Sequence, residues 1–247
     1  MLKVDPSEYT TMYEVEDHHW WYVGMRHITK TLLDHYVGKH IPMILDAGCG
    51  TGANLVLLGE YGVAIGVDIE PAALELCRRR QLSRLIVGSV TRLPFADESF
   101  DMVTSFEVLY HLAVADDRQG LKEFARVLRP GGWLLLRLPA YNWLRGKHDL
   151  AVHTRHRYTT TEVKNKVTMA GFAIVGLSYA NCLLFPLAVA KRLMERVWPS
   201  GTGSDVGPPP PENRWLAAIL SAEAAWLRQR SLPWGLSVVC LARKVEE

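Results

Sequence analysis

A glycine-rich segment between an apolar stretch and an amphipathic one is the first feature with chemical potential. Residues 46–52 read DAGCGTG, and Gly48, Gly50 and Gly52 allow the backbone to turn tightly and to approach a ligand. Asp68 ends the next apolar segment, where a carboxylate can accept hydrogen bonds from ribose hydroxyls. Together these residues predict a site for an adenosine cofactor, although the glycines alone would also fit an ordinary strand-to-helix turn.

Histidines supply the candidate catalytic bases. His111 follows the fourth predicted strand, and His153 and His156 lie in a later polar loop. An oxygen nucleophile would need such a base, whereas a neutral amine would not, and a hydrogen-bonded loop role stays open for each ring. His148, His153 and His156 have no carboxylate or thiolate partner with supporting spacing, so we expect no metal site.

The loop 139–158 is the predicted acceptor pocket. Loops of this length are often functional, and this one follows the fifth predicted strand, at the sheet edge where ligands of open α/β folds bind. We expect His153 to act as the base and Arg155 and Arg157 to anchor the acceptor. The other candidate substrate contacts are Tyr141, Trp143 and Tyr158. A solvated, salt-bridged surface is the alternative for the same side chains.

Short apolar segments alternate with helical ones, which predicts a sheet covered by helices on both faces. The fold class is α/β, a seven-stranded and mostly parallel doubly wound sheet with an antiparallel last strand. Strands are expected at 43–47, 63–69, 84–88, 101–106, 133–138, 172–180 and 235–244, and helices at 53–61, 71–80, 121–128 and 159–171. The domains expected are an N-terminal helical lid (1–42), a core (43–180 and 235–247) and a helical insertion (181–234) with a Pro-rich linker at 201–211.

Four segments resemble, in order and spacing, the motifs of one enzyme family. ILDAGCGTGANL, GVDIEPAALELC, LPFADESFDMVTSFEVLYHL and FARVLRPGGWLLL are similar to those of class I, Rossmann-like methyltransferases that use S-adenosylmethionine, in a bacterial small-molecule branch. The resemblance implies that Asp46 and the glycines border the methionine moiety, that Asp68 holds the ribose and that Ile69 packs on adenine. Ser89 stands where relatives commonly have an aspartate for the adenine amino group. The remaining implied cofactor contacts are Cys49, Val90, Phe106 and Glu107.

The segment EDHHWWYVGMRH (16–27) resembles the lead-in of a bacterial branch of that family, and HTRHRYTTTEV (153–163) resembles a second segment of it. If 16–27 is a lid, Tyr22 and Arg26 contact the cofactor, and Arg26 reaches its carboxylate. The alternative is a helix that caps the sheet and buries its tryptophans. In the insertion, Glu223 lies on an apolar stripe, so we expect it to pair with a basic group.

Charge and cysteine content bear on which partners and which compartment we expect for this chain. A net charge of +2 from 28 basic and 26 acidic residues does not favour nucleic acid. Four widely spaced cysteines and an N-terminus without a basic start and apolar run indicate the cytoplasm. We expect methylation of a small molecule that is aromatic, anionic or lipid-like. The alternatives are an NAD-dependent oxidoreductase and a non-catalytic cofactor-binding scaffold subunit; contact with a membrane surface and a homodimer through 181–234 stay open.

Overall fold

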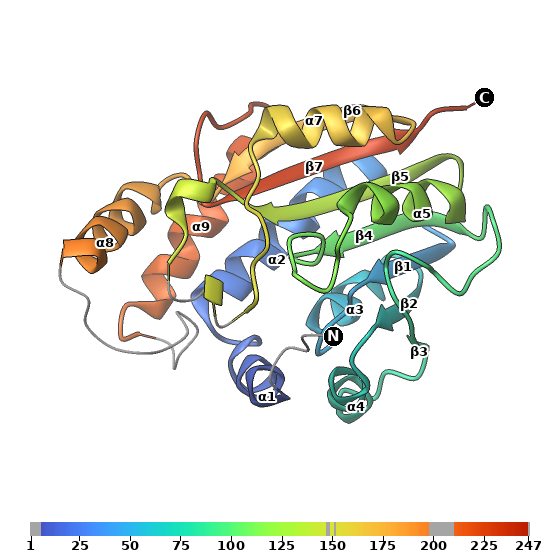
Figure 1. Cartoon of the computed structure of the whole chain (residues 1–247), viewed down its shortest axis with the longest axis horizontal. Coiled ribbons are helices and arrows are strands. Elements are labelled where there is room, and N and C mark those ends of the chain that lie inside the picture. Colours follow the sequence, from blue (N-terminus) through green and yellow to red (C-terminus); the bar gives the residue numbers. More distant parts are fainter. Residues whose placement is uncertain (1–5, 147–148, 151, 198–209, 247) are drawn as a thin grey trace.

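A sheet of seven strands organises the chain (Figure 1). The computed structural model describes residues 6–146, 149–150, 152–197 and 210–246. Its strands are β1 (Met43–Ala47), β2 (Val63–Asp68), β3 (Leu85–Val87), β4 (Phe100–Phe106), β5 (Leu128–Pro139), β6 (Phe172–Ala180) and β7 (Ser237–Lys244). They lie in the order β3-β2-β1-β4-β5-β7-β6, parallel from β3 to β5, with β7 antiparallel to both of its neighbours. The predicted fold class is confirmed.

The main departure from the predicted strands is the start of β5. This strand begins at Leu128, which pairs with Phe100 across a register shift, and not at residue 133. The Arg-Pro-Gly-Gly segment therefore ends the preceding helix and also forms the irregular first part of the strand. Arg129 secures this part through an ion pair with Asp101 of β4 (2.5 Å).

Helices cover both faces of the sheet. One face carries α5 (Asp117–Val127) and α7 (Thr160–Met169), and the other carries α2 (Trp20–Leu32), α3 (Ala53–Leu58) and α9 (Asn213–Leu227). Alternate residues of β5 point to the two layers, because Leu134 and Leu136 pack with α5 while Leu135 packs with α2 and α9. A further helix, α4 (Pro71–Arg79), follows β2.

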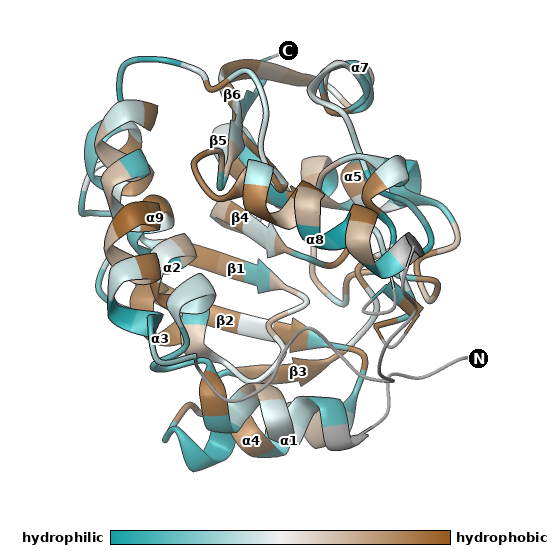
Figure 2. Ribbon diagram, turned by 90° about the vertical axis from the view of Figure 1, so that its left-hand side faces the viewer, coloured by the Kyte–Doolittle hydropathy of each residue, from teal (hydrophilic) through white to brown (hydrophobic). Residues whose placement is uncertain are grey.

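Segments from the two ends of the chain lie side by side in the second layer, where α9 runs along α2 (Figure 2). The close approach depends on Gly24, since a Cβ atom there would lie 2.6 Å from the side chain of Leu220. The side-chain amide of Asn213 accepts a hydrogen bond from the backbone N–H of Trp20 (2.6 Å) and donates one to the carbonyl of His18 (2.7 Å). The helix α9 is thus part of the main core.

Glu223 of α9 corrects a prediction. It is buried, but its Oε1 accepts a hydrogen bond from the backbone N–H of Leu183 (2.6 Å), and no basic partner is found for it among the described residues. A backbone amide can satisfy a buried carboxylate oxygen as a cation does. This bond ties α9 to the segment that leads into α8 (Phe185–Val197). The predicted Pro-rich linker falls outside the described residues up to position 209.

Two helices lie at the carboxyl edge of the parallel strands, α1 (Pro6–Val15) and α8 (Figure 2). Neither they nor the other helices in the described ranges have the length and apolar content needed to cross a membrane. Both helices contribute side chains to the cavity described next.

Candidate active site

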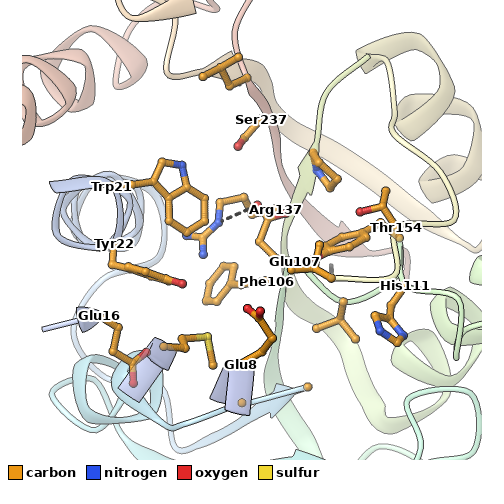
Figure 3. A pocket seen from close by; sticks show the side chains of 18 of the residues that line it. Glu8, Glu16, Trp21, Tyr22, Phe106, Glu107, His111, Arg137, Thr154 and Ser237 are labelled. Carbon is orange, nitrogen blue, oxygen red and sulfur yellow. Dashed lines mark hydrogen bonds and ion pairs between the residues drawn. The ribbon is translucent and has the colours of Figure 1, made fainter. Parts of the chain in front are cut away.

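A cavity of about 1300 Å³ opens at the carboxyl edge of the sheet (Figure 3). Its walls come from the glycine loop, the ends of β2, β4, β5 and β7, and the helices α1, α2 and α8. Because pockets for one small ligand are commonly about 300–1,000 Å³, this cavity has room for two. The predicted site residues that line it are Tyr22, Arg26, Gly48, Cys49, Gly50, Asp68, Ile69, Ser89, Val90, Phe106, Glu107, His111 and Arg157.

The glycine loop forms the floor at one end of the cavity. Gly48 has a φ of +87°, and a Cβ atom there would lie 2.3 Å from the side chain of Val108. Glycine is therefore required both for the backbone conformation and for the space. Gly52, by contrast, caps the start of α3 and does not line the cavity.

Asp68 lies beside this loop and is 7% exposed. Its Oδ2 accepts a hydrogen bond from the N–H of Gly50 and its Oδ1 accepts one from the N–H of Glu70, both at 2.9 Å. Burial raises the pKa of Asp68, and these two amides counteract that effect. A carboxylate has about four acceptor positions, so Asp68 shapes the loop and can still accept further hydrogen bonds from a ligand in the cavity.

The neighbouring wall combines apolar and hydroxyl groups. Ile69 is exposed towards the cavity and Val90 is buried beside it. The hydroxyl of Ser89 lies 2.9 Å from that of Thr91 and accepts a hydrogen bond from the N–H of Thr91 (3.2 Å). Ser89 therefore closes a local turn with its side chain, and it also lines the cavity.

Buried charge ties the N-terminal segment to the glycine loop. Glu16 accepts hydrogen bonds from the Thr51 hydroxyl and from Arg80 (2.9 Å), and Arg80 also pairs with Asp17 (2.7 Å). Burial raises the pKa of Glu16, although the bonds from Thr51 and Arg80 act against it. Met12 of α1 lies directly over Gly50, with its methyl carbon 3.1 Å from the position of a Cβ atom. The segment therefore covers the loop end of the cavity.

The two cofactor contacts predicted on α2, Tyr22 and Arg26, differ in whether they already bond other parts of the protein. Tyr22 points into the cavity (Figure 3), and burial raises the pKa of its hydroxyl. Arg26 also lines the cavity, but its Nη2 donates to the backbone carbonyl of Glu16 (2.6 Å). Burial lowers the pKa of Arg26, which remains a cation with further donors for a ligand.

Asp46 does not line the cavity. It is 1% exposed beneath the loop, where its Oδ1 accepts a hydrogen bond from the hydroxyl of Thr104 (2.7 Å). Its Oδ2 has no hydrogen-bond partner among the residues that the structure describes, and burial raises the pKa of this carboxyl to about 7. Any contact between Asp46 and a ligand is therefore not direct in this conformation.

A buried ion pair stands in the middle of the cavity. Arg137 of β5 donates from Nε to Oε1 of Glu107, which follows β4 (3.2 Å; Figure 3). Glu107 has a φ of +58°, a strained value that turns its carboxylate towards Arg137. Burial raises the pKa of Glu107, whereas the cations of Arg137 and Arg157 lower it.

The three candidate histidines separate in space. His111 lines the cavity, and its Nδ1 accepts a hydrogen bond from the N–H of Ala113 (2.9 Å). His153 stands behind it, with ring centroids 5.9 Å apart, and does not line the cavity. The ring of His156 bonds Glu162 (2.9 Å). Only His111 of the three is therefore placed to touch a ligand here.

The side chains of the loop 139–158 mostly stabilise the loop itself. Arg155 pairs with Asp117 (3.2 Å), and the buried Tyr158 donates to the same carboxylate (2.7 Å). Arg157 pairs with Asp149 (2.6 Å) but also lines the cavity. Tyr141 and Trp143 contact each other outside the cavity lining, with ring centroids 5.7 Å apart. Among these five candidates, all of them described by the structure, Arg157 alone lines the cavity.

Other residues of the cavity were not predicted from the sequence. They include Arg137, Trp21, Asn181, Ser237 and Glu16. The available signal was a cation in the otherwise apolar strand segment WLLLRLP. Within the described ranges, no group of three or more histidine, cysteine, aspartate or glutamate side chains is arranged to hold a metal.

Residues 45–136 match the family model described as a methyltransferase domain. A demethylmenaquinone methyltransferase from Mycobacterium sp. (strain KMS) is 42% identical over 94 residues, which cover 38% of this chain and 40% of the relative. A tRNA (carboxymethyluridine(34)-5-O)-methyltransferase from Arabidopsis thaliana is 32% identical over 114 residues, covering 46% and 27%. Residues 45–136 of this chain are a class I methyltransferase domain. The chain spans about half or less of the length of the curated relatives it matches.

The fold of the methyltransferase domain extends over almost the whole chain. The solved structure of a SAM-dependent methyltransferase from Thermotoga maritima superposes with a TM-score of 0.63 at 18% identity, covering 96% of this chain and 95% of the other. S-adenosyl-L-methionine is the cofactor that the family implies. The site fits this cofactor. The glycine floor lets a ligand approach the protein backbone closely, and the carboxylate of Asp68 offers hydrogen-bond acceptors for the ribose hydroxyls.

Proposed function

We propose that this chain transfers the methyl group of S-adenosylmethionine to a small organic molecule. The observation that carries the proposal is the continuity of the cavity. Gly48, Gly50 and Asp68 line this cavity together with Arg137 and residues of α8. A methyl donor beside the glycines and an acceptor beside α8 would therefore meet without crossing a protein wall.

The proposed cofactor contacts divide by chemistry. Asp68 accepts hydrogen bonds from the ribose, Ile69 and Val90 pack against the adenine, and Arg26 binds the methionine carboxylate. When bound, the cofactor supplies a methyl group already activated on a sulfonium. The protein then has to align the acceptor with that methyl group and exclude water. We propose that the N-terminal segment, which Glu16 ties to the glycine loop, excludes water from the cavity.

We assign His111 an orienting role. Its Nδ1 accepts from the N–H of Ala113, so the neutral ring carries its proton on Nε2, a buried atom without a partner in the described structure. Burial and the nearby His153 lower the pKa of His111, which keeps the ring neutral near pH 7. In this tautomer His111 donates a hydrogen bond to an oxygen of the acceptor and does not remove a proton.

An RNA acceptor is the second candidate, because the Arabidopsis relative is named for action on tRNA. Two features favour a small molecule. The net charge of +2 provides no strong attraction for a polyanion, and α8 lines the cavity with apolar side chains such as Leu187 and Met194 as well as with charged ones. Four buried free cysteines are in keeping with a reducing compartment.

The test is a transfer assay with S-adenosylmethionine labelled in its methyl group. The protein is incubated separately with a small-molecule extract and with total tRNA, and with Asp68→Ala as the control variant. We expect label in the small-molecule fraction, lost in the variant. Label only in tRNA would overturn the acceptor class. No transfer to either fraction together with no binding of the cofactor would overturn the enzymatic function.

A further inference from the structure

Arg137 occupies a position in β5 where the sheet otherwise carries apolar side chains. Leu135 and Val239 share its face of the sheet, and Val239 is its direct partner on β7. Arg137 is only 5% exposed. An arginine buried in this layer is costly unless its donors have acceptors, so a further partner is expected.

The guanidinium of Arg137 has three neighbouring side chains. Glu107 takes its Nε, and the rings of Trp21 and Phe106 lie on it with their centroids 5.3 and 4.8 Å from the guanidinium carbon. Its Nη1 is buried and has no hydrogen-bond partner among the described residues. These contacts fix the orientation of the guanidinium in the cavity wall, between Trp21, Phe106 and Glu107 (Figure 3).

Asn181 presents further unpartnered groups in the same part of the cavity. It follows β6 with a φ of +60° and is fully buried, and neither Oδ1 nor Nδ2 has a partner in the described parts of the chain. The pairing of Ala180 with Ser237, and of Ser237 with Pro139, brings the ends of β6, β7 and β5 together here. Buried polar groups are normally paired, so unpartnered ones on two residues that line one cavity favour a polar ligand there.

We propose that Arg137, Asn181 and Ser237 bind a carboxylate of the methyl acceptor. The proposal rests on the proposed function, since it names the class of molecule that the methyltransferase accepts. The fork of a guanidinium matches the two oxygens of a carboxylate, and the amide of Asn181 and the hydroxyl of Ser237 can donate to the same group.

Charge selects a monoanion over a phosphate. Glu107 and Asp149 offset Arg137 and Arg157, so these two ion pairs together contribute no net charge. The sulfonium of the cofactor adds one positive charge, which one carboxylate balances and a phosphate dianion exceeds. The apolar side chains of α8, including Leu187 and Ala188, would face the rest of the acceptor. An aromatic or aliphatic carboxylic acid would fit both the proposed anion subsite and the apolar side chains.

The experiment compares the binding of 2-naphthoate, its neutral amide 2-naphthamide and 2-naphthyl phosphate, by calorimetry, with and without S-adenosylhomocysteine. We expect 2-naphthoate to bind at least about tenfold more tightly than either analogue, as for loss of a charge-assisted hydrogen bond. Equal binding of acid and amide would overturn the subsite, and preference for the phosphate would overturn the choice of a carboxylate. Binding of 2-naphthoate to a protein that does not bind S-adenosylhomocysteine would leave the subsite standing and reject the methyltransferase proposal.

Two variants separate the subsite from a structural role. Asn181→Asp places a negative charge in the subsite without removing the Arg137–Glu107 pair, and aspartate tolerates a positive φ. We expect this variant to bind 2-naphthoate about tenfold or more weakly and to keep its affinity for S-adenosylhomocysteine. Asn165→Asp, the same change on the exposed side of α7, is the matched control.

The paired variant Arg137→Gln with Glu107→Gln removes the cation while keeping a hydrogen-bonding pair. It should lose the preference for acid over amide, with folding checked by circular dichroism. If the paired variant instead loses S-adenosylhomocysteine and keeps the preference for 2-naphthoate, Arg137 holds the cofactor and the proposal is wrong. Retention of the preference by a folded Asn181→Asp would also contradict it.

Discussion

Replacing Asp68 by asparagine tests how the carboxylate divides its work between the loop and the ligand. Asparagine has one oxygen, which can keep the bond from the N–H of Glu70 as a local turn. Its NH2 group would then face the N–H of Gly50, a donor facing a donor, in place of the 2.9 Å bond in the native protein. Asp68→Asn therefore loses one bond to the loop and at least one proposed bond to the ribose.

These losses set the expected magnitudes. Leaving the Gly50 amide unsatisfied costs about 1–3 kcal/mol of the free energy of unfolding. Loss of a hydrogen bond from the ribose to a charged group costs about 1.5–3 kcal/mol of binding free energy, or roughly 10- to 150-fold in Kd. The affinity for S-adenosylhomocysteine should fall accordingly.

Calorimetry of S-adenosylhomocysteine and its 2′-deoxy analogue, with both proteins, isolates the direct contact from the effect on the loop. If Asp68 touches the ribose, removing the 2′-hydroxyl should weaken binding to the native protein and have much less effect on binding to Asp68→Asn, a coupling in the double cycle. Glu75→Gln, an exposed carboxylate paired with Arg78 on the following helix (3.0 Å), is the control. Equal effects of the deoxy change on both proteins would refute the ribose contact.

The other predictions concern two aspartates and a histidine. Asp46→Asn should raise the free energy of unfolding at pH 8 by up to about 4 kcal/mol, because burial raises the folded-state pKa to about 7, so the native protein loses stability as pH rises from 4 to 7; no gain in denaturant unfolding at pH 8 would contradict this. Asp117→Asn should instead lower the free energy of unfolding at neutral pH. Although burial opposes it, hydrogen bonds from Lys166 and its neighbours hold the pKa of Asp117 below its usual value, so its stabilisation exists at neutral pH and disappears as pH falls below about 4; an unchanged midpoint at pH 7 would count against it. His111→Ala should slow methyl transfer by more than His153→Ala does, since only the first ring lines the cavity, and the reverse order in a steady-state assay would return the catalytic role to His153.

The sheet and its cofactor edge could be predicted because their signals are local. Apolar runs bounded by turns place the strands, and glycines with a following acidic residue require only nearby chain. The start of β5 differs because pairing of Leu128 with Phe100 depends on a neighbouring strand.

The acceptor end is less accessible to sequence reasoning because its side chains are shared between distant elements. Arg155 and Tyr158 have the composition of a binding loop, yet both bind Asp117, which lies about forty positions earlier in the chain. Arg137 could not be distinguished from a surface arginine without knowing which face of β5 the helix α2 covers. The partner of Glu223 is likewise a backbone amide, which cannot be predicted from residue types because every residue except proline carries one.

Calorimetric titration of the purified protein with S-adenosylhomocysteine and, in parallel, with NAD is the most direct test of the central claim. We expect saturable binding of S-adenosylhomocysteine at a stoichiometry of one per chain and no measurable heat with NAD, because the glycine floor and Asp68 line the cavity and residues 45–136 match a methyltransferase domain. Tight binding of NAD with no heat from S-adenosylhomocysteine would contradict it.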